Sequence, residues 1–174
     1  MLARRLPLLV ALASVASVAC VGDVSSHEEA REAWLKTVAV LDDGDARIRG
    51  TNGESLPPET EFRAGSMPYS ANRTFACPTG GTVEFRGNYY LDPGDGAFLG
   101  YDYEVELKRC TVDGLRIDGL LDVNRESDAD GGTITYSGEV TWHDEIQGKC
   151  PLDLTMNPVG GTLCDFEAKT VLGG

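Results

Sequence analysis

Residues 82–91 read Thr-Val-Glu-Phe-Arg-Gly-Asn-Tyr-Tyr-Leu, and their alternation decides the fold class. The odd-numbered side chains are apolar on both sides of Gly87, whereas the even-numbered ones are mostly polar. Successive side chains of a β-strand point to opposite faces, so one face of this segment is apolar and the other is wet. The stretch therefore predicts a half-buried strand with a glycine at its centre.

The same pattern recurs along the second half of the chain. Residues 115–123 alternate around Gly119 and residues 134–142 around Gly138. Residues 99–107 alternate without a central glycine, and 152–156 and 164–168 supply two shorter strands. Turn-forming residues separate these segments at 92–96, 113–114, 128–132 and 157–161. We therefore expect a mainly β protein built as an antiparallel meander.

A width estimate narrows the architecture of this sheet. Six strands at about 4.8 Å each span roughly 29 Å, whereas a single helix is about 10–12 Å wide. One helix should therefore leave part of a flat apolar face uncovered. Glycines in mid-strand allow sharp bends. We expect a strongly curved sheet or partial barrel with one N-terminal helix packed into its mouth, and a β-sandwich is the alternative.

The expected helix lies near the start of the mature chain. Ser26 and Glu29 fit a capping box, and apolar residues recur at helical spacing through about Leu41. Residues 42–45 read Asp-Asp-Gly-Asp and predict the helix end. Residues 46–72 are polar and interrupted by prolines, so we expect irregular structure with one short strand at 46–49. Residues 25–72 and 73–174 together form one expected structural domain.

The cysteines fit a disulfide framework. Cys77 and Cys110 flank the turn at 92–96, and Cys150 and Cys164 flank the turn at 157–161. Antiparallel neighbours bring such ends together, so we expect the pairs Cys77–Cys110 and Cys150–Cys164 among three possible connectivities. The parity of the first pair needs a bulge, which we place at Gly80-Gly81.

The first twenty residues have the parts of a secretory signal. Arg4 and Arg5 precede an uncharged run that is too short to span a bilayer as a helix. Ser17-Val18-Ala19-Cys20 resembles the lipobox of bacterial lipoproteins, although Ser17 stands where that family usually has Leu. The resemblance implies a signal peptide at 1–19, a lipidated Cys20 and a tether at 20–24. Ordinary cleavage at the same bond would leave Cys20 as an odd fifth thiol.

Location and charge limit the partners that we expect. In lipoproteins of this kind, Val21 rather than Asp after the cysteine implies the outer membrane. Removing residues 1–19 takes away two arginines and no acid, so the net charge of −13 becomes −15. Such a surface repels phosphate backbones and anionic headgroups, so nucleic acid is not an expected partner. The membrane contact that we expect is the N-terminal lipid.

Motifs for catalysis or metal binding are scarce in this chain. His27 reads as a solvated helix residue, and His143 as a residue at a strand end. No serine lies in a GxSxG elbow. Residues 126–131 resemble the start of a calcium loop, but Ser137 stands where the closing Glu should be, and the loop joins strands. We expect no catalytic residues, metal site or cofactor.

The aromatic residues on the expected inner face are the better lead to function. They either fill the core or line an apolar pocket, and they are Phe85, Tyr89, Tyr101, Tyr103, Tyr136 and Trp142. The leading hypothesis is a non-enzymatic, lipid-anchored envelope protein that binds a partner protein or an apolar ligand on its curved sheet. The alternatives are an accessory subunit that docks through its polar strand face or long loop, and a hydrolase that uses carboxylates converging in a cleft.

Overall fold

The computed structural model describes residues 24–50, 66–127 and 132–173. Helix α1 (His27–Gly50) precedes all the strands, and the short helix α2 (Ala168–Leu172) follows them. The strands of the described chain are β1 (Met67–Ser70), β2 (Arg73–Ala76), β3 (Gly80–Leu91), β4 (Phe98–Val112), β5 (Leu115–Glu126), β6 (Thr133–Asp144), β7 (Gly148–Met156), β8 (Gly160–Leu163) and β9 (Phe166–Glu167).

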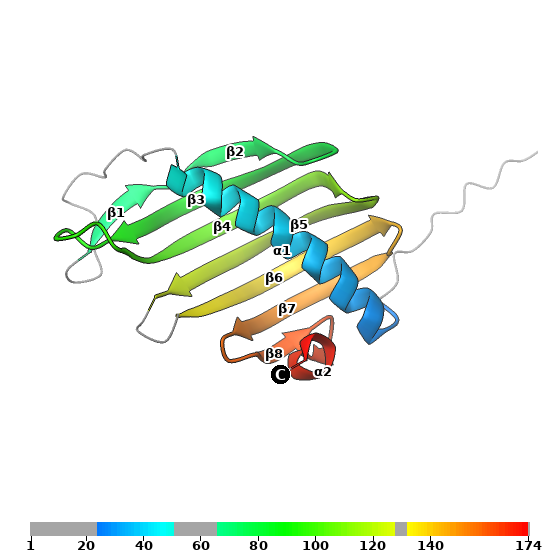
Figure 1. Ribbon diagram of the computed structural model, residues 1–174. Coiled ribbons are helices and arrows are strands. Elements are labelled where there is room, and N and C mark those ends of the chain that lie inside the picture. The colour runs from blue at the N-terminus through cyan, green and yellow to red at the C-terminus, as the bar shows by residue number, and fades with distance from the viewer. Residues whose placement is uncertain (1–23, 51–65, 128–131, 174) are drawn as a thin grey trace, which may run out of the picture.

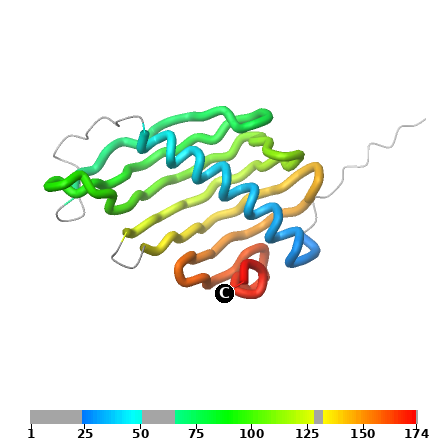
Figure 2. The backbone as a smooth tube through the Cα atoms, viewed as in Figure 1, coloured from blue at the N-terminus to red at the C-terminus, as the bar shows by residue number. Residues whose placement is uncertain are grey.

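All of these strands belong to one antiparallel sheet, and from β3 onward each strand pairs with the next one in the chain. Both β1 and β2 pair with β3, so they share one edge of the sheet. The sheet is open, because β9 at the far edge does not return to the first strands (Figures 1 and 2). The expected antiparallel meander is confirmed, and the described residues form no second sheet layer.

Helix α1 crosses one face of the sheet diagonally, which is how one helix covers so many strands (Figure 1). Near its start Trp34 meets the ring of Tyr136 on β6, and further along Gly44 lies against Phe85 on β3. At about 1.5 Å per residue, the 24 residues of α1 extend over about 36 Å. The width estimate used the diameter of a helix, whereas a diagonal helix covers a sheet by its length.

The expected start of α1 is confirmed, but its expected end is wrong. Ser26 Oγ accepts a hydrogen bond from the Glu29 amide at 3.2 Å, as in a capping box. The helix then continues through residues 42–45 to Gly50, so the strand expected at 46–49 is helical. Asp45 and Ile48 are buried against the sheet, and this packing outweighs the weak helix propensity of Asp and Gly. Of the segment expected to be irregular, residues 51–65 lie outside the described chain, and β1 is a strand.

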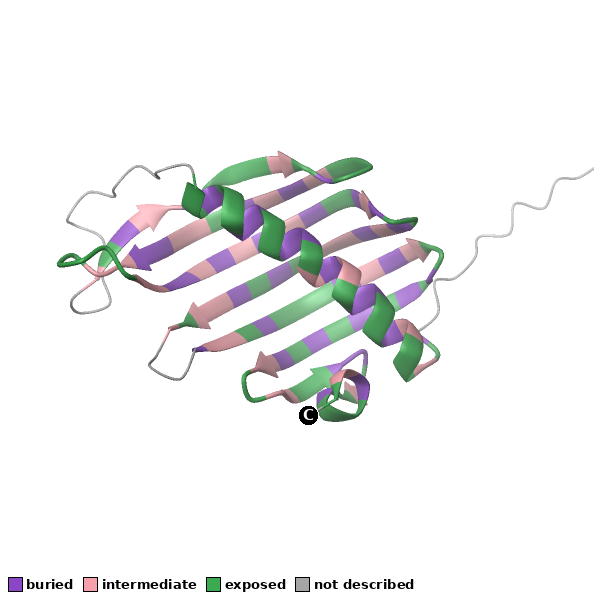
Figure 3. Ribbon diagram, in the orientation of Figure 1, coloured by how far each residue is buried: buried purple, intermediate pink, exposed green. Residues whose placement is uncertain are grey.

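Side chains that point towards α1 form the core, and burial alternates along the strands (Figure 3). Trp142 is fully buried, and its indole donates a 3.1 Å hydrogen bond to Thr37 on α1. Thr37 in turn donates to the carbonyl of Ala33 at 2.8 Å. The polar atoms of this core contact therefore satisfy one another, which removes the penalty for burying them.

The C-terminal strand predicted at 164–168 is confirmed only at Phe166 and Glu167. Cys164 and Asp165 have positive φ values and form a tight turn after β8. Only Phe166 and Glu167 are extended, and the chain then enters α2, whose Ala168 and Val171 are buried. The alternation of Cys164, Phe166 and Ala168 is real, but it spans a turn, a two-residue strand and a helix start.

Both predicted disulfides are present. Cys77 and Cys110 are joined with their Cα atoms 5.4 Å apart, and Cys150 and Cys164 with theirs 4.1 Å apart. The pairing of β3 with β4 shifts register between Gly80 and Thr82, which is the bulge that the first pair required. These bonds fasten the start of β3 to β4 and the turn after β8 to β7.

Candidate functional site

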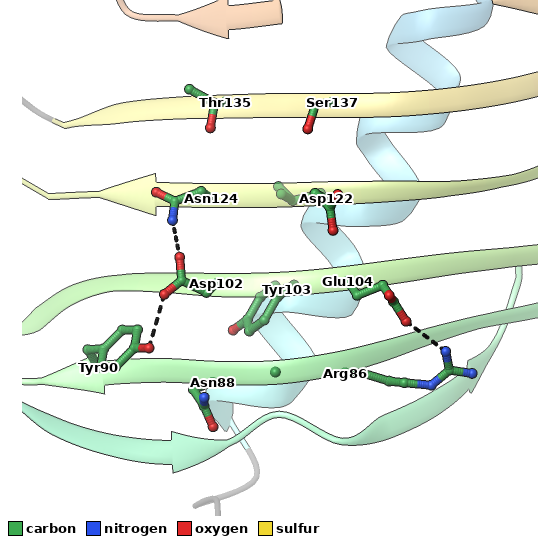
Figure 4. A pocket seen from close by; sticks show the side chains of 12 residues that line it. Arg86, Asn88, Tyr90, Asp102, Tyr103, Glu104, Asp122, Asn124, Thr135 and Ser137 are labelled. Carbon is green, nitrogen blue, oxygen red and sulfur yellow. Dashed lines mark hydrogen bonds and ion pairs between the residues drawn. The ribbon is translucent and has the colours of Figure 1, made fainter. Parts of the chain in front are cut away.

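No helix or strand of the described chain covers the face of the sheet opposite α1, which we call the open face, and it carries a shallow hollow of about 430 Å³ (Figure 4). Two rows of polar side chains, each crossing β3 to β6, line the hollow. The first row is Arg86, Glu104, Asp122 and Ser137, and the second is Asn88, Asp102, Asn124 and Thr135. The rows exist because residues paired across neighbouring strands point to the same face.

Asp102 connects three strands at one end of the hollow. Its carboxylate accepts a hydrogen bond from the Tyr90 hydroxyl at 3.0 Å and another from the side-chain amide of Asn124 (Figure 4). Three strands are thus linked through one carboxylate, which fixes the orientation of the Asn124 amide. Charge-assisted hydrogen bonds of this kind are stronger than neutral ones.

Arg86 organises the other end of the hollow. Its guanidinium donates to Glu84 at 3.0 Å and to Glu104 and Glu106 at 2.8 Å each. Hydrogen bonds from Arg86 lower the pKa of Glu84, and the three acids raise the pKa of Arg86. Lys108 holds the pKa of Glu106 below its usual range by donating to it. These groups are exposed to water, so their contribution to stability is small.

Asp122 and Asp153 differ from those paired acids. Both are exposed, and neither has an ion pair or side-chain hydrogen bond with any residue of the described chain. Both pair with Ser137, one from β5 and the other from β7, so they flank its hydroxyl. This part of the face therefore presents carboxylates that form no ion pair with a basic side chain of residues 24–50, 66–127 and 132–173.

The open face as a whole is acidic. A second shallow hollow of about 570 Å³ adjoins Leu120, whose side chain is 49% exposed. The basic side chains that the strand register places on this face are Arg86, Lys108, Arg116 and Lys149. The more numerous acidic ones are Glu84, Asp102, Glu104, Glu106, Asp118, Asp122, Glu126, Glu139 and Asp153.

The aromatic residues singled out in the sequence lie on the opposite, covered face. Each is at most 4% exposed, and they are Phe85, Tyr89, Tyr101, Tyr103, Tyr136 and Trp142. The structure therefore places them in the core beneath α1. Tyr103 alone also contributes to the floor of the hollow, and its hydroxyl points away from it towards Asp45 on α1. The polar face was visible as alternating Glu, Asp, Asn and Thr, but no sequence signal marked the hollow.

A second polar cluster, which the sequence did not reveal, lies between α1 and the sheet. Asp45 is only 6% exposed, and it accepts from the Tyr103 hydroxyl at 3.2 Å and from Arg49 at 2.5 Å. One helical turn earlier, burial raises the pKa of Asp42, and the Asp45 charge raises it further. Arg125 on β5 adds a second guanidinium to this cluster.

Neither the two histidines nor the calcium-like segment at 126–131 forms a metal site in the described chain. The His27 ring packs edge-on against Phe166, with ring centroids 4.5 Å apart. His143 Nε2 lies 3.5 Å from a carboxylate oxygen of Asp118 on the open face. Residues 128–131 of the calcium-like loop lie outside the described chain. In the rest of it, His, Cys, Asp and Glu side chains nowhere gather in threes around a possible metal position.

Models of known protein families, curated proteins and solved structures contain no match to this chain. Among the described residues, no helix has the length and apolar character needed to cross a membrane. The inference about function therefore depends on the geometry and charge of the site itself.

Proposed function

We propose that the protein is a lipid-anchored, non-enzymatic component of the bacterial outer membrane that docks a basic partner protein on its open sheet face. Lipidation at Cys20 is supported by the lipobox-like Ser17-Val18-Ala19-Cys20. An oxidising compartment is supported by the two disulfides. Docking of this kind would make the protein an accessory subunit of an envelope assembly.

The docking proposal depends on a difference between the two faces of the sheet: one is covered by α1 and the other by no helix or strand of the described chain (Figure 1). Helix α1 buries the aromatic face, so an apolar ligand would have to displace the helix to reach it. The opposite face carries an acidic surplus and two shallow hollows. Complementary charge guides encounter and suppresses wrong partners, so a basic surface is the partner chemistry that this face favours.

The sheet edges are poor alternatives for docking by strand addition. At one edge β1 and β2 have four residues each, and at the other β9 has two and leads directly into α2. Short edge strands are a common means of preventing further strand pairing. The long strands β3 to β6 lie inside the sheet between paired neighbours, and β8 pairs with β7 over Leu152–Thr155.

A carboxylate-based hydrolase has one observation in its favour, because the hollow brings Asp102, Glu104 and Asp122 together. Glu104 and Asp122 are direct neighbours across β4 and β5, where Cβ atoms lie about 4.5–5.5 Å apart. However, Asp102 and Glu104 are already held by hydrogen bonds from other side chains. The hollow is also broad and open to water, so the geometry favours docking over catalysis.

Site-specific photo-crosslinking in the native bacterium tests the docking face. A benzophenone side chain would replace Ser137 on the open face or, as the control, Leu35, which is 55% exposed on α1. We expect the position at Ser137 to give a discrete protein adduct and the position at Leu35 to give none. The double substitution Asp122→Lys and Asp153→Lys should remove the adduct. Adducts from the helix surface alone, or adducts insensitive to the charge reversal, would contradict the proposal.

A further inference from the structure

Arg125 carries a charge on the covered side of the sheet without a bonded counter-ion. It points to the same side as Tyr101, its cross-strand partner, and its guanidinium lies 5.4 Å from the Phe98 ring centroid. Its Nε atom is buried and has no hydrogen-bond partner, and no carboxylate in the described chain lies within ion-pair distance of it. A buried donor that lacks a partner costs free energy.

Two tyrosine hydroxyls near Arg125 are also without partners in the described chain. Tyr101 and Tyr136 are 4% and 3% exposed, and the pKa of each is raised, first by burial and then by neighbouring groups. Tyr136 pairs with Val123, two residues from Arg125 on the same side of β5. Their hydroxyl oxygens are not among the fully buried unpartnered atoms of the described chain, so they remain accessible to a small ligand, whereas the Tyr103 hydroxyl is already bonded to Asp45.

The charges around Arg125 leave room for one more negative group. Asp45 is already matched by Arg49, at 2.5 Å. The remaining acid is Asp42, which is exposed on α1 and forms no ion pair with Arg125. Arg125 is therefore a guanidinium that forms no ion pair with a carboxylate of the described chain.

We infer that Arg125, Tyr101 and Tyr136 form a binding site for a small carboxylate between α1 and the sheet. The planar guanidinium can donate two parallel hydrogen bonds to a carboxylate. The Tyr101 and Tyr136 hydroxyls can donate to the same carboxylate from β4 and β6, the two strands on either side of β5. This site lies on the face opposite the docking face, so it does not depend on the proposed function.

Titration with sodium acetate, followed by amide and aromatic NMR signals at constant ionic strength set with sodium chloride, tests the site. We expect saturable shifts of residues around Arg125, and binding weaker by about tenfold or more in Arg125→Gln. Arg116→Gln is the matched control, because Arg116 Nε is also buried without a partner, but Asp118 lies 4.0 Å from it. This control should bind acetate like the wild type.

The double variant Tyr101→Phe and Tyr136→Phe keeps the guanidinium and the packing but removes both hydroxyl donors. It should also bind acetate more weakly, and it tests the site independently if Arg125→Gln does not fold. Three results would overturn the inference: no saturable shifts, equal binding by wild type and Arg125→Gln, or saturation by inorganic phosphate and not by acetate. If sodium chloride alone produces the same shifts, they are not caused by acetate, and the inference is overturned as well.

Discussion

Gly44 of α1 lies directly against the ring of Phe85 on β3, so close that a Cβ atom at Gly44 would be 2.3 Å from a ring carbon. In the sequence, Gly44 belongs to Asp-Asp-Gly-Asp and looks like a helix end. In the structure, α1 lies so close to the sheet at this residue that only glycine fits without a shift of the Phe85 ring or the helix. The contact lets the second half of the helix cover β3 and β4.

Gly44→Ala should therefore destabilise the protein, even though Ala favours a helix interior by about 1 kcal/mol over Gly. The new methyl group would force the Phe85 ring or the helix to move, and overpacking of this kind costs about 1–3 kcal/mol. Gly50→Ala is the control, because no atom lies within 4 Å of the position of its Cβ. Urea unfolding of both variants measures the difference. If Gly44→Ala unfolds at the same or higher urea than the control, the close approach is wrong.

Gly119→Val should destabilise the sheet because the new side chain would collide with the backbone of the neighbouring strand β6. A Cβ atom at Gly119 would lie 2.5 Å from the Glu139 carbonyl oxygen and 2.9 Å from the Val140 Cα atom on β6. Backbone atoms of a paired strand cannot move aside cheaply, so we expect a loss of about 1–3 kcal/mol or more. Gly160→Ala, where no neighbour lies within 4 Å, should be nearly neutral. A melting temperature raised by Gly119→Val would contradict this packing.

Asp42 should make stability depend on pH. Burial, followed by the Asp45 charge, raises its pKa, and Arg125 and Arg49 oppose the shift. A raised folded-state pKa gives stability that is present below the unfolded pKa, about 3.9, and is lost as pH rises through the folded value. Asp42→Asn should therefore gain stability relative to the wild type between pH 4 and 7.

The effect at Asp42 should be modest, because the residue lies at the exposed edge of its cluster. Asp43→Asn is the matched control on the next residue of α1, where the carboxylate forms a 2.7 Å ion pair with Arg47. Chemical unfolding at a series of pH values compares the two variants. A gain for Asp42→Asn that is the same at pH 3 and pH 7 would exclude a titrating Asp42 as its cause.

Lipidation predicts a defined mass and location. If Cys20 is the lipidated N-terminus, intact-mass spectrometry of the native protein should show a chain that begins at Cys20 with acyl groups attached. Cys20→Ser should move the protein from the membrane fraction to the soluble fraction and leave its melting temperature unchanged, because the fold described here begins at residue 24. An unmodified Cys20 thiol on the mature chain would contradict the lipid anchor.

The period-two pattern predicted β3 to β7 because each of those strands has one covered and one wet face, as around Gly87. The disulfides followed from the same pattern, because antiparallel hairpins bring Cys77 near Cys110. The end of α1 could not be predicted from the residues around it. The helix continues past Gly44 because that glycine packs against the ring of Phe85, which is far away in sequence. Likewise, Cys164 and Phe166 alternate like residues of one strand, although Cys164 lies in the turn after β8 and Phe166 lies in β9.

The candidate site was predictable only as a surface. The alternation of their strands places Asp102, Asp122 and Ser137 on the wet face. Which of these side chains face one another depends on the register between β4, β5 and β6, and a single sequence does not specify that register. The cluster around Asp45 and Arg125 was hidden for a related reason, because it needs the helical continuation of α1 past Leu41.

The affinity of the crosslinked partner for two variants of equal net charge tests the docking face most directly. Asp122→Lys with Asp153→Lys changes the open face, whereas Glu28→Lys with Asp43→Lys makes the same charge change on the exposed surface of α1. With calorimetry at fixed ionic strength, we expect the first pair to weaken binding by about tenfold or more and the second to leave it nearly unchanged. Equal weakening by both pairs, or none by the first, would contradict docking on the open sheet face.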